Sequence, residues 1–243
     1  MSFKLTIDQG NTAAKVVVWD GDNAVDGTMF TSLTDEAVRS LVERYRPAGV
    51  MYCSVVDDGA AVRRMFGSMG IECHVLTHLT PMPLDLSAYA NTATLGADRI
   101  AAMVGAMSLY PGRELLVIDI GTAVTYDHVM ADGRFVGGNI APGVAMRLNA
   151  LNHFTARLPL IDSTGDYSPC GTDTRTAMRG GAVYGVVGEI AYYRSLMPAG
   201  CVTVLAGGWA ADIAAILGDD VKVERRLVGL GLNRLLNYSH SIK

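Results

Sequence analysis

Apolar residues follow two spacings along the chain, and each spacing predicts a different element. Short apolar runs such as Phe3–Ile7 and Leu115–Ile118 predict buried strands. Between such runs, apolar residues recur at i, i+3, i+4 and i+7, which predicts helices that each bury one stripe against a core. Three of these stripes begin at Val38, Val62 and Ile100. The alternation of strands and helices indicates an α/β protein.

An internal repeat organises this pattern. The segment Ile7-Asp-Gln-Gly-Asn-Thr12 recurs, nearly half the chain later, as Ile118-Asp-Ile-Gly-Thr-Ala123. Each copy follows one strand, precedes a second strand and then reaches an Asp-Gly pair, at Asp20-Gly21 and Asp132-Gly133, that is typical of hairpins. The repeat predicts two similar domains, which we divide near Pro111-Gly112 into residues 1–112 and 113–243.

The second half contains a helix pattern with a stripe of small residues. The stripe consists of Ala177, Gly181, Gly185 and Gly188. Each glycine costs a helix about 1 kcal/mol relative to alanine, so several on one face indicate close approach by another helix, a partner subunit or a ligand. Residues 202–213 then predict a strand, a Gly-Gly turn and a helix.

Composition excludes several classes of protein. Of 243 residues, 50% are hydrophobic and 18% are charged, which excludes a disordered chain. The net charge of −4 comes without a basic stripe, so no nucleic-acid partner is expected, and no apolar run is long enough to predict a membrane span. Asp8 interrupts any signal-like N-terminal segment, and the four cysteines form no CxxC pair. We therefore expect a cytoplasmic protein with reduced thiols.

The repeated turn has the chemistry of a phosphate site. Glycine allows the backbone N–H groups to approach an oxyanion, and the hydroxyls of Thr12 and Thr122 would add donors. Asp8 and Asp119 could hold a hard cation between nucleotide phosphates, and Lys15 could add a positive charge. One Asp-x-Gly turn is weak support, but two matched copies indicate a nucleotide-binding protein.

Other motifs are absent or ambiguous. The chain contains no P-loop, no strand-linked GxGxxG and no HExxH or GxSxG segment. His74 and His78 are four residues apart, but their flanks favour structural or solvated histidines over a metal site. Asp98 begins a predicted helix, where it could stabilise the N-terminus or act in catalysis, and Arg99 would otherwise be a surface charge.

The chain resembles the type III pantothenate kinases over nearly its whole length. The matching motifs, in order, are Asp8-Gln-Gly-Asn-Thr12, Leu95-Gly-Ala-Asp-Arg99, Asp119-Ile-Gly-Thr-Ala123, Gly137-Gly-Asn-Ile-Ala-Pro-Gly143, Thr155-Ala-Arg-Leu-Pro159 and Gly171-Thr-Asp-Thr-Arg-Thr-Ala-Met178. The resemblance implies two duplicated ribonuclease-H-like domains of the acetate-and-sugar-kinase/Hsp70/actin superfamily. It also implies a homodimer that phosphorylates pantothenate with ATP, the first step of coenzyme A synthesis.

The resemblance also assigns residues. For ATP, with its Mg²⁺, it implies Asp8, Gln9, Gly10, Asn11, Thr12, Ala13, Ala14, Lys15 and Thr122. For pantothenate it implies Tyr89, Gly96, Ala97, Asp98, Arg99 and Thr174, with Asp98 as the general base. Asp119 resembles the ligand of a required K⁺ or NH₄⁺ ion. Gln9 and Thr92 depart from the usual family residues without removing a reactive group.

Two alternatives stay open at the level of sequence. One is a non-catalytic nucleotide-binding regulatory protein of the same superfamily, and the other is a kinase for a different small hydroxylated acceptor. The cluster of Tyr89, Asp98, Arg99 and Thr174 favours a kinase, because a pure nucleotide switch does not need it. We expect Thr174 to act in the site of the partner subunit, the alternative being a simple helix N-cap.

Overall fold

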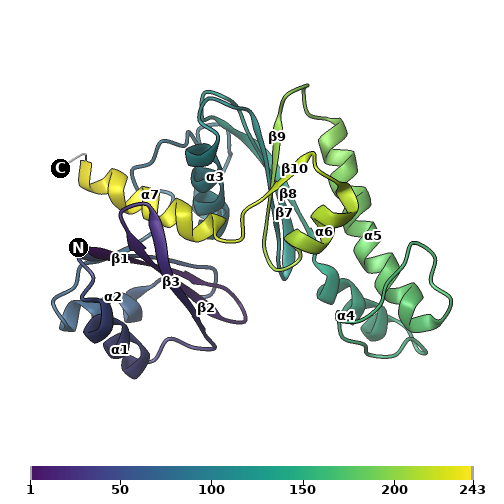
Figure 1. Ribbon diagram of the computed structural model, residues 1–243, viewed down its shortest axis with the longest axis horizontal. Helices are drawn as coiled ribbons and strands as arrows, with labels where there is room; N and C mark the ends of the chain where they lie inside the picture. Colours follow the sequence, from purple (N-terminus) through teal and green to yellow (C-terminus); the bar gives the residue numbers. More distant parts are fainter. Residues whose placement is uncertain (1, 242–243) are drawn as a thin grey trace. The chain divides into compact units, whose positions relative to one another are not determined.

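The computed structural model describes residues 2–241, which form two compact units (Figure 1). Within the described chain, unit 1 comprises residues 2–112, 132–135 and 226–241, and unit 2 comprises residues 113–131 and 136–225. The main segment of unit 1 ends at Gly112, where the sequence suggests a boundary. A single division of the chain at residue 112 leaves out residues 132–135 and 226–241, which also belong to unit 1.

Unit 1 contains a five-stranded sheet in the order β3-β2-β1-β4-β5. The first three strands pair antiparallel, and β4 and β5 continue the sheet in parallel with β1. One face packs on α1 (Asp35–Tyr45) and α2 (Ala60–Ser68) through buried residues such as Ile7, Leu41 and Phe66. The strands are β1 (Phe3–Gln9), β2 (Ala14–Asp20), β3 (Asn23–Phe30), β4 (Gly49–Ser54) and β5 (Cys73–Val75).

Unit 2 repeats this topology. Its sheet has the order β10-β9-β6-β7-β8, so each strand has a counterpart at the same place in unit 1. Again the first two strands pair antiparallel, and β9 and β10 continue in parallel. The repeat predicted from Asp8 and Asp119 is therefore confirmed as a duplication of the whole sheet. The strands are β6 (Leu115–Ile120), β7 (Ala123–Val129), β8 (Phe135–Pro142), β9 (Val202–Ala206) and β10 (Val221–Val223).

Two helices pack backbone to backbone within unit 1. They are α3 (Ala97–Leu109) and α7 (Leu227–Ser241). A Cβ atom added to Gly231 would lie 1.8 Å from the Ala101 carbonyl oxygen, so only glycine permits this approach. Because α7 covers a second side of α3, every residue from Arg99 to Ala106 is buried. The prediction of a single core-facing stripe is therefore wrong for α3.

The remaining helices belong to unit 2 and are α4 (Val144–Phe154), α5 (Thr174–Ser195) and α6 (Ala210–Leu217). The long helix α5 packs on the sheet through Val183, Val186 and Ile190. Its N-cap is Asp173, which accepts from the Thr176 N–H over 2.9 Å in a capping box. The reading of Thr174 as N-cap is thus wrong, since Thr174 is the first helical residue. No helix within residues 2–241 is long and apolar enough to span a membrane.

Candidate functional site

The first phosphate-type turn connects β1 and β2 in unit 1. Its strands place Asp8 directly opposite Lys15, and the Gly10 N–H closes the turn by donating to the Ala13 carbonyl over 3.0 Å. Asn11 and Thr12 are exposed at the tip, where a ligand can reach them. The Gln9 amide donates to the Gly10 carbonyl over 2.9 Å, so this unusual family residue is accommodated within the turn. The predicted residues Asp8–Lys15 thus form one β-hairpin turn together with the paired ends of β1 and β2.

Asp8 lies in a confined, acidic environment. Its side chain is 14% exposed, and the Lys15 ammonium lies 3.7 Å from its Oδ2 atom. On the other neighbouring strand, the buried Cys53 thiol donates to Asp8 Oδ1 over 3.7 Å. Burial raises the pKa of Asp8, Lys15 opposes that shift, and the nearby Asp98 carboxylate raises the pKa further. The Asp98 carboxylate is therefore near enough to Asp8 to influence its charge.

Asp98 and Arg99 begin α3 after the helix N-cap Gly96. Asp98 Oδ1 accepts from the Arg99 N–H over 2.8 Å, so the carboxylate does stabilise the first turn, and it is also partly accessible. Arg99 is only 6% exposed, which contradicts its reading as a surface charge. Its guanidinium lies 5.9 Å from the centre of the Phe135 ring, within the range of a cation–π contact.

Tyr89 lies in the long loop before α3 and joins the same cluster. Its ring centre is 5.4 Å from that of Phe135, so Phe135 contacts both Tyr89 and Arg99. Phe135 is held in place by its own N–H, which donates to the Asp85 carbonyl over 2.9 Å. The structure thus gathers the predicted acceptor residues Tyr89 and Arg99 around an aromatic ring.

The second phosphate-type turn connects β6 and β7 in unit 2. The Gly121 N–H donates to the Ala123 carbonyl over 2.9 Å, so the second turn also closes on its glycine but is one residue shorter than the first, and Thr122 is exposed at the tip. Asp119 precedes the turn, and Gly207 packs so closely that an added Cβ would lie 2.4 Å from Asp119 Oδ1. Gly143 lies on the turn itself and donates to the Thr122 carbonyl over 3.0 Å.

Thr174 is exposed at the start of α5 in unit 2. Within the same stripe, Gly185 packs against the Arg147 guanidinium, whereas a Cβ at Gly181 or Gly188 would meet no atom within 4 Å. Ala177 is approached by Gly171, whose added Cβ would lie 2.2 Å from the Ala177 nitrogen. Within residues 2–241, the close approach expected along this face is therefore provided at Ala177 and Gly185 but not at Gly181 or Gly188.

Sequence reasoning missed four residues that shape these turns and the acceptor cluster. They are Cys53, Phe135, Gly143 and Gly207. Gly143 ends a family motif and Gly207 lies in the Gly-Gly turn, so both carried a signal. Cys53 and Phe135 carried none, because neither strand alternation nor helical spacing reveals a neighbour from another strand or loop.

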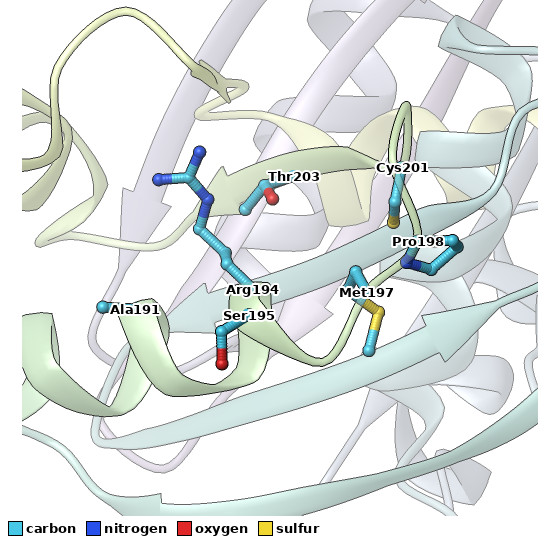
Figure 2. Close-up of a pocket in the computed structure, with 7 residues that line it drawn as sticks. All are labelled: Ala191, Arg194, Ser195, Met197, Pro198, Cys201 and Thr203. Atoms are coloured by element: carbon cyan, nitrogen blue, oxygen red, sulfur yellow. The ribbon is translucent and has the colours of Figure 1, made fainter.

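A separate pocket of about 350 Å³ lies in unit 2, between the end of α5 and the start of β9 (Figure 2). Thr203 lies near the start of β9, whereas Asp119 pairs with Ala206 at the opposite end of that strand. Figure 2 shows the Arg194 guanidinium pointing away from Met197 and Pro198. None of the residues predicted for the site lines this pocket, whose lining is Ala191, Arg194, Ser195, Met197, Pro198, Cys201 and Thr203.

Comparison with solved structures identifies the fold. The chain superposes on component A of the (R)-2-hydroxyglutaryl-CoA dehydratase of Acidaminococcus fermentans with a TM-score of 0.56, at 16% identity and with complete coverage of both chains. It superposes on a ROK family protein of Streptococcus pneumoniae with a TM-score of 0.51, at 12% identity, covering 98% of this chain and 99% of the other. The chain therefore shares the fold of these proteins, which here consists of two domains with the same five-stranded sheet topology.

Comparison of sequences identifies the family. The family model described as type III pantothenate kinase matches residues 4–195. The type III pantothenate kinase of Porphyromonas gingivalis is 39% identical over 98% of this chain and 100% of its own length. That of Bacteroides fragilis is 36% identical over 98% of this chain and 99% of its own. With both phosphate-type turns and the Asp98 cluster in place, the chain belongs to the type III pantothenate kinase family.

Proposed function

We propose that the chain transfers the γ-phosphate of ATP to the primary hydroxyl of pantothenate, as the first step of coenzyme A synthesis. The observation that carries this proposal is the proximity of Asp98 to the Asp8 turn within unit 1. A phosphate turn beside an accessible carboxylate at a helix N-terminus suits a phosphoryl acceptor whose hydroxyl must lose a proton. A pure nucleotide switch has no use for that carboxylate.

Phosphoryl transfer requires mainly positioning and charge neutralisation from the protein. In the proposed mechanism, Asp98 accepts the proton of the pantothenate hydroxyl as the oxygen attacks the γ-phosphorus atom and ADP leaves. Arg99 pairs with an oxygen of the substrate. Its planar guanidinium suits the pantothenate carboxylate, because it can donate two parallel hydrogen bonds to that group. The Phe135 ring supports this role, because it restricts the guanidinium to one region beside Tyr89.

The two turns are proposed to hold ATP. Asp8–Lys15 would bind phosphate oxygens, and Thr122 would contribute its hydroxyl to the nucleotide. The residues present fit the implied cations. The Asp98 carboxylate disfavours the charged form of Asp8, and the Mg²⁺ that accompanies ATP would offset this repulsion. Asp119, closely surrounded by Gly207 and Gly121, would hold K⁺ or NH₄⁺, whose charge would offset that of the phosphates.

The active form is proposed to be a cytoplasmic homodimer in which Thr174 completes the pantothenate site of the partner subunit. The exposed glycines of α5 support this assembly, because at Gly181 and Gly188 no atom of the described residues, apart from the neighbouring turns of the helix itself, lies within 4 Å of an added Cβ. A second copy of the same face could approach closely there, as a two-fold axis allows. All four cysteines are free thiols, which agrees with a reducing compartment.

A coupled assay of ADP release tests the proposed function. Purified protein is incubated with MgATP and K⁺, with pantothenate or with other small hydroxylated acids and sugars as acceptor. We expect ADP release that depends on pantothenate, with equimolar phosphopantothenate detected by mass spectrometry. Release that is independent of acceptor, or that is faster with a different acceptor, would overturn the assignment of substrate.

A further inference from the structure

A charged network in unit 2 joins three elements behind the second phosphate-type turn. The Arg147 guanidinium of α4 donates through Nη2 to both carboxylate oxygens of Glu189 on α5, each over 2.6 Å. Tyr126 of β7 donates its hydroxyl to Glu189 Oε2 over 2.8 Å. The side chains of Arg147 and Glu189 are only 20% and 35% exposed. Such charge-assisted bonds in a partly buried place hold their partners in one arrangement.

This network reaches the turn through the end of β8. Arg147 Nε donates to the Pro142 carbonyl over 2.8 Å, and the next residue, Gly143, donates to the Thr122 carbonyl over 3.0 Å. A Cβ on Gly143 would lie 2.3 Å from the Gly121 carbonyl oxygen, so the two backbones are in direct contact. A shift of Pro142–Gly143 must therefore move Gly121–Thr122 with it.

The surrounding sequence is arranged to leave room for arginine. A Cβ at Gly185 of α5 would lie 2.9 Å from Arg147 Nη1, so a larger residue there would displace the guanidinium. Lysine could retain the charge pairing with Glu189, but it has a single nitrogen and cannot also reach the Pro142 carbonyl in the fixed fork geometry. Burial raises the pKa of Tyr126, and its bond to Glu189 adds to this, so its hydroxyl remains a donor.

We propose that Arg147 is a positioning residue for ATP: with Glu189 and Tyr126, it fixes the Pro142–Gly143 segment and thereby holds the Gly121–Thr122 turn in its phosphate-binding shape. The inference rests on the proposed function, in which Thr122 meets the nucleotide. Arg147 itself touches no reacting atom in this scheme. Because Arg147 holds the Gly121–Thr122 turn in this shape before ATP binds, the turn needs less reorganisation on binding.

The test separates positioning from simple stabilisation with a matched control. Arg179 of α5 also donates through Nε to a backbone carbonyl, that of Asp162 over 3.2 Å, and pairs with the Asp162 carboxylate, but these bonds do not involve the Gly121–Thr122 turn. Arg147→Lys and Arg179→Lys are compared with the wild type by Tm, by the Kd for ADP and a non-hydrolysable ATP analogue, and by steady-state kinetics. All measurements are made well below the lowest Tm.

For Arg147→Lys we expect nucleotide affinity and kcat/KM for ATP to fall about tenfold or more, while KM for pantothenate changes less than about twofold. Arg179→Lys should keep its nucleotide affinity even if its Tm falls. A nucleotide Kd that is unchanged in Arg147→Lys, or that is raised equally in the Arg179→Lys control, overturns the proposal. If Arg147→Lys does not fold, Glu189→Gln replaces it, with the same direction expected. Because nucleotide Kd is read without pantothenate, failure of the proposed substrate would show separately in the ADP-release assay.

Discussion

At the scale of single residues, Asp8 lies in the turn that we propose binds ATP, although its surroundings disfavour its charged form. Burial and the neighbouring Asp98 raise its pKa above the ordinary value of 3.8, despite Lys15. A raised pKa in the folded state means that this group favours folding while protonated, below pH 3.8, and that the advantage is lost as the pH rises through the raised folded value. At neutral pH the charged Asp8 therefore destabilises the protein without ligand.

Asp8→Asn should consequently raise Tm at pH 7 in the absence of nucleotide, while it weakens binding of MgATP. The gain in Tm should shrink as the pH approaches 4, because both states of the wild type then become protonated. Thermal denaturation from pH 4 to 8 checks this, with the exposed Asp219→Asn as control. A lower Tm for Asp8→Asn at pH 7 would show that the contact with Lys15 outweighs burial.

Asp98→Asn tests the proposed base. The amide retains an oxygen that can accept from the Arg99 N–H, so the start of α3 should remain intact. We expect kcat to fall about 10²- to 10⁴-fold, with the Kd for ATP nearly unchanged. Calorimetric titration and the ADP-release assay measure the two quantities. A variant that keeps more than about half of the wild-type kcat would make Asp98 a helix-stabilising residue only.

Asp119 should make activity depend on a monovalent cation in addition to Mg²⁺. Replacing K⁺ by Na⁺ at constant ionic strength should slow the reaction strongly, because the proposed site at Asp119 would have to fit the size of the ion that it holds. Asp119→Ala should be slower and should respond less to this exchange. Initial rates in the two salts, with choline chloride as a third, decide the point. Equal rates in K⁺ and Na⁺ count against the assignment.

The sequence predicted candidate reactive residues, but it did not predict the residues that pack against them. Asp8 could be selected because its turn recurs at Asp119, and Asp98 could be selected because the family resemblance assigns it a role. Phe135 could not be selected, since it opens an ordinary strand, β8, and its role depends on Tyr89 and Arg99 from a distant part of the chain. Arg99 was misjudged for the same reason: burial of a charge is a property of the packed neighbours.

At the scale of elements, the period of the apolar pattern identified α1, α2 and α3, and the repeat identified β1, β2, β6 and β7. What the pattern could not reveal was the partner of each element. The stripe on α3 indicated one buried face, but α7 buries a second. The local signs of this contact were small residues on both helices: Ala101 and Gly105 on α3, and Gly231 on α7.

The contact between α3 and α7 is predicted to depend on glycine. Gly231→Ala would place a Cβ 1.8 Å from the Ala101 oxygen and 2.9 Å from the Gly105 nitrogen, atoms of backbone that cannot rotate away. We expect a loss of about 1–3 kcal/mol or more in the free energy of unfolding. In α2, an added Cβ at Gly67 meets no atom within 4 Å, so Gly67→Ala should be neutral or stabilise by up to about 1 kcal/mol. Urea denaturation of both variants makes the comparison, and equal stabilities would contradict it.

At the scale of the whole molecule, the proposed sharing of sites between subunits can be tested by complementation. Asp98→Asn protein is mixed with a Thr174 variant that has lost pantothenate binding, and the subunits are allowed to exchange. If Thr174 acts in the partner's site, each mixed dimer has one doubly altered site and one intact site, so activity reappears. If Thr174 acts in its own subunit, both sites stay defective. Each variant mixed only with itself provides the baseline.

The return of α7 to unit 1 has a consequence for biosynthesis. The ribosome releases residues 2–112 first, yet α7, which covers α3, follows only after unit 2 has been made. Until then the apolar side of α3 around Ala101 and Gly105 has no cover, and Trp19 lacks its neighbour Leu230. The nascent N-terminal half therefore remains partly folded until α7 has been synthesised. During that interval its exposed apolar surface is a site where chaperones can bind.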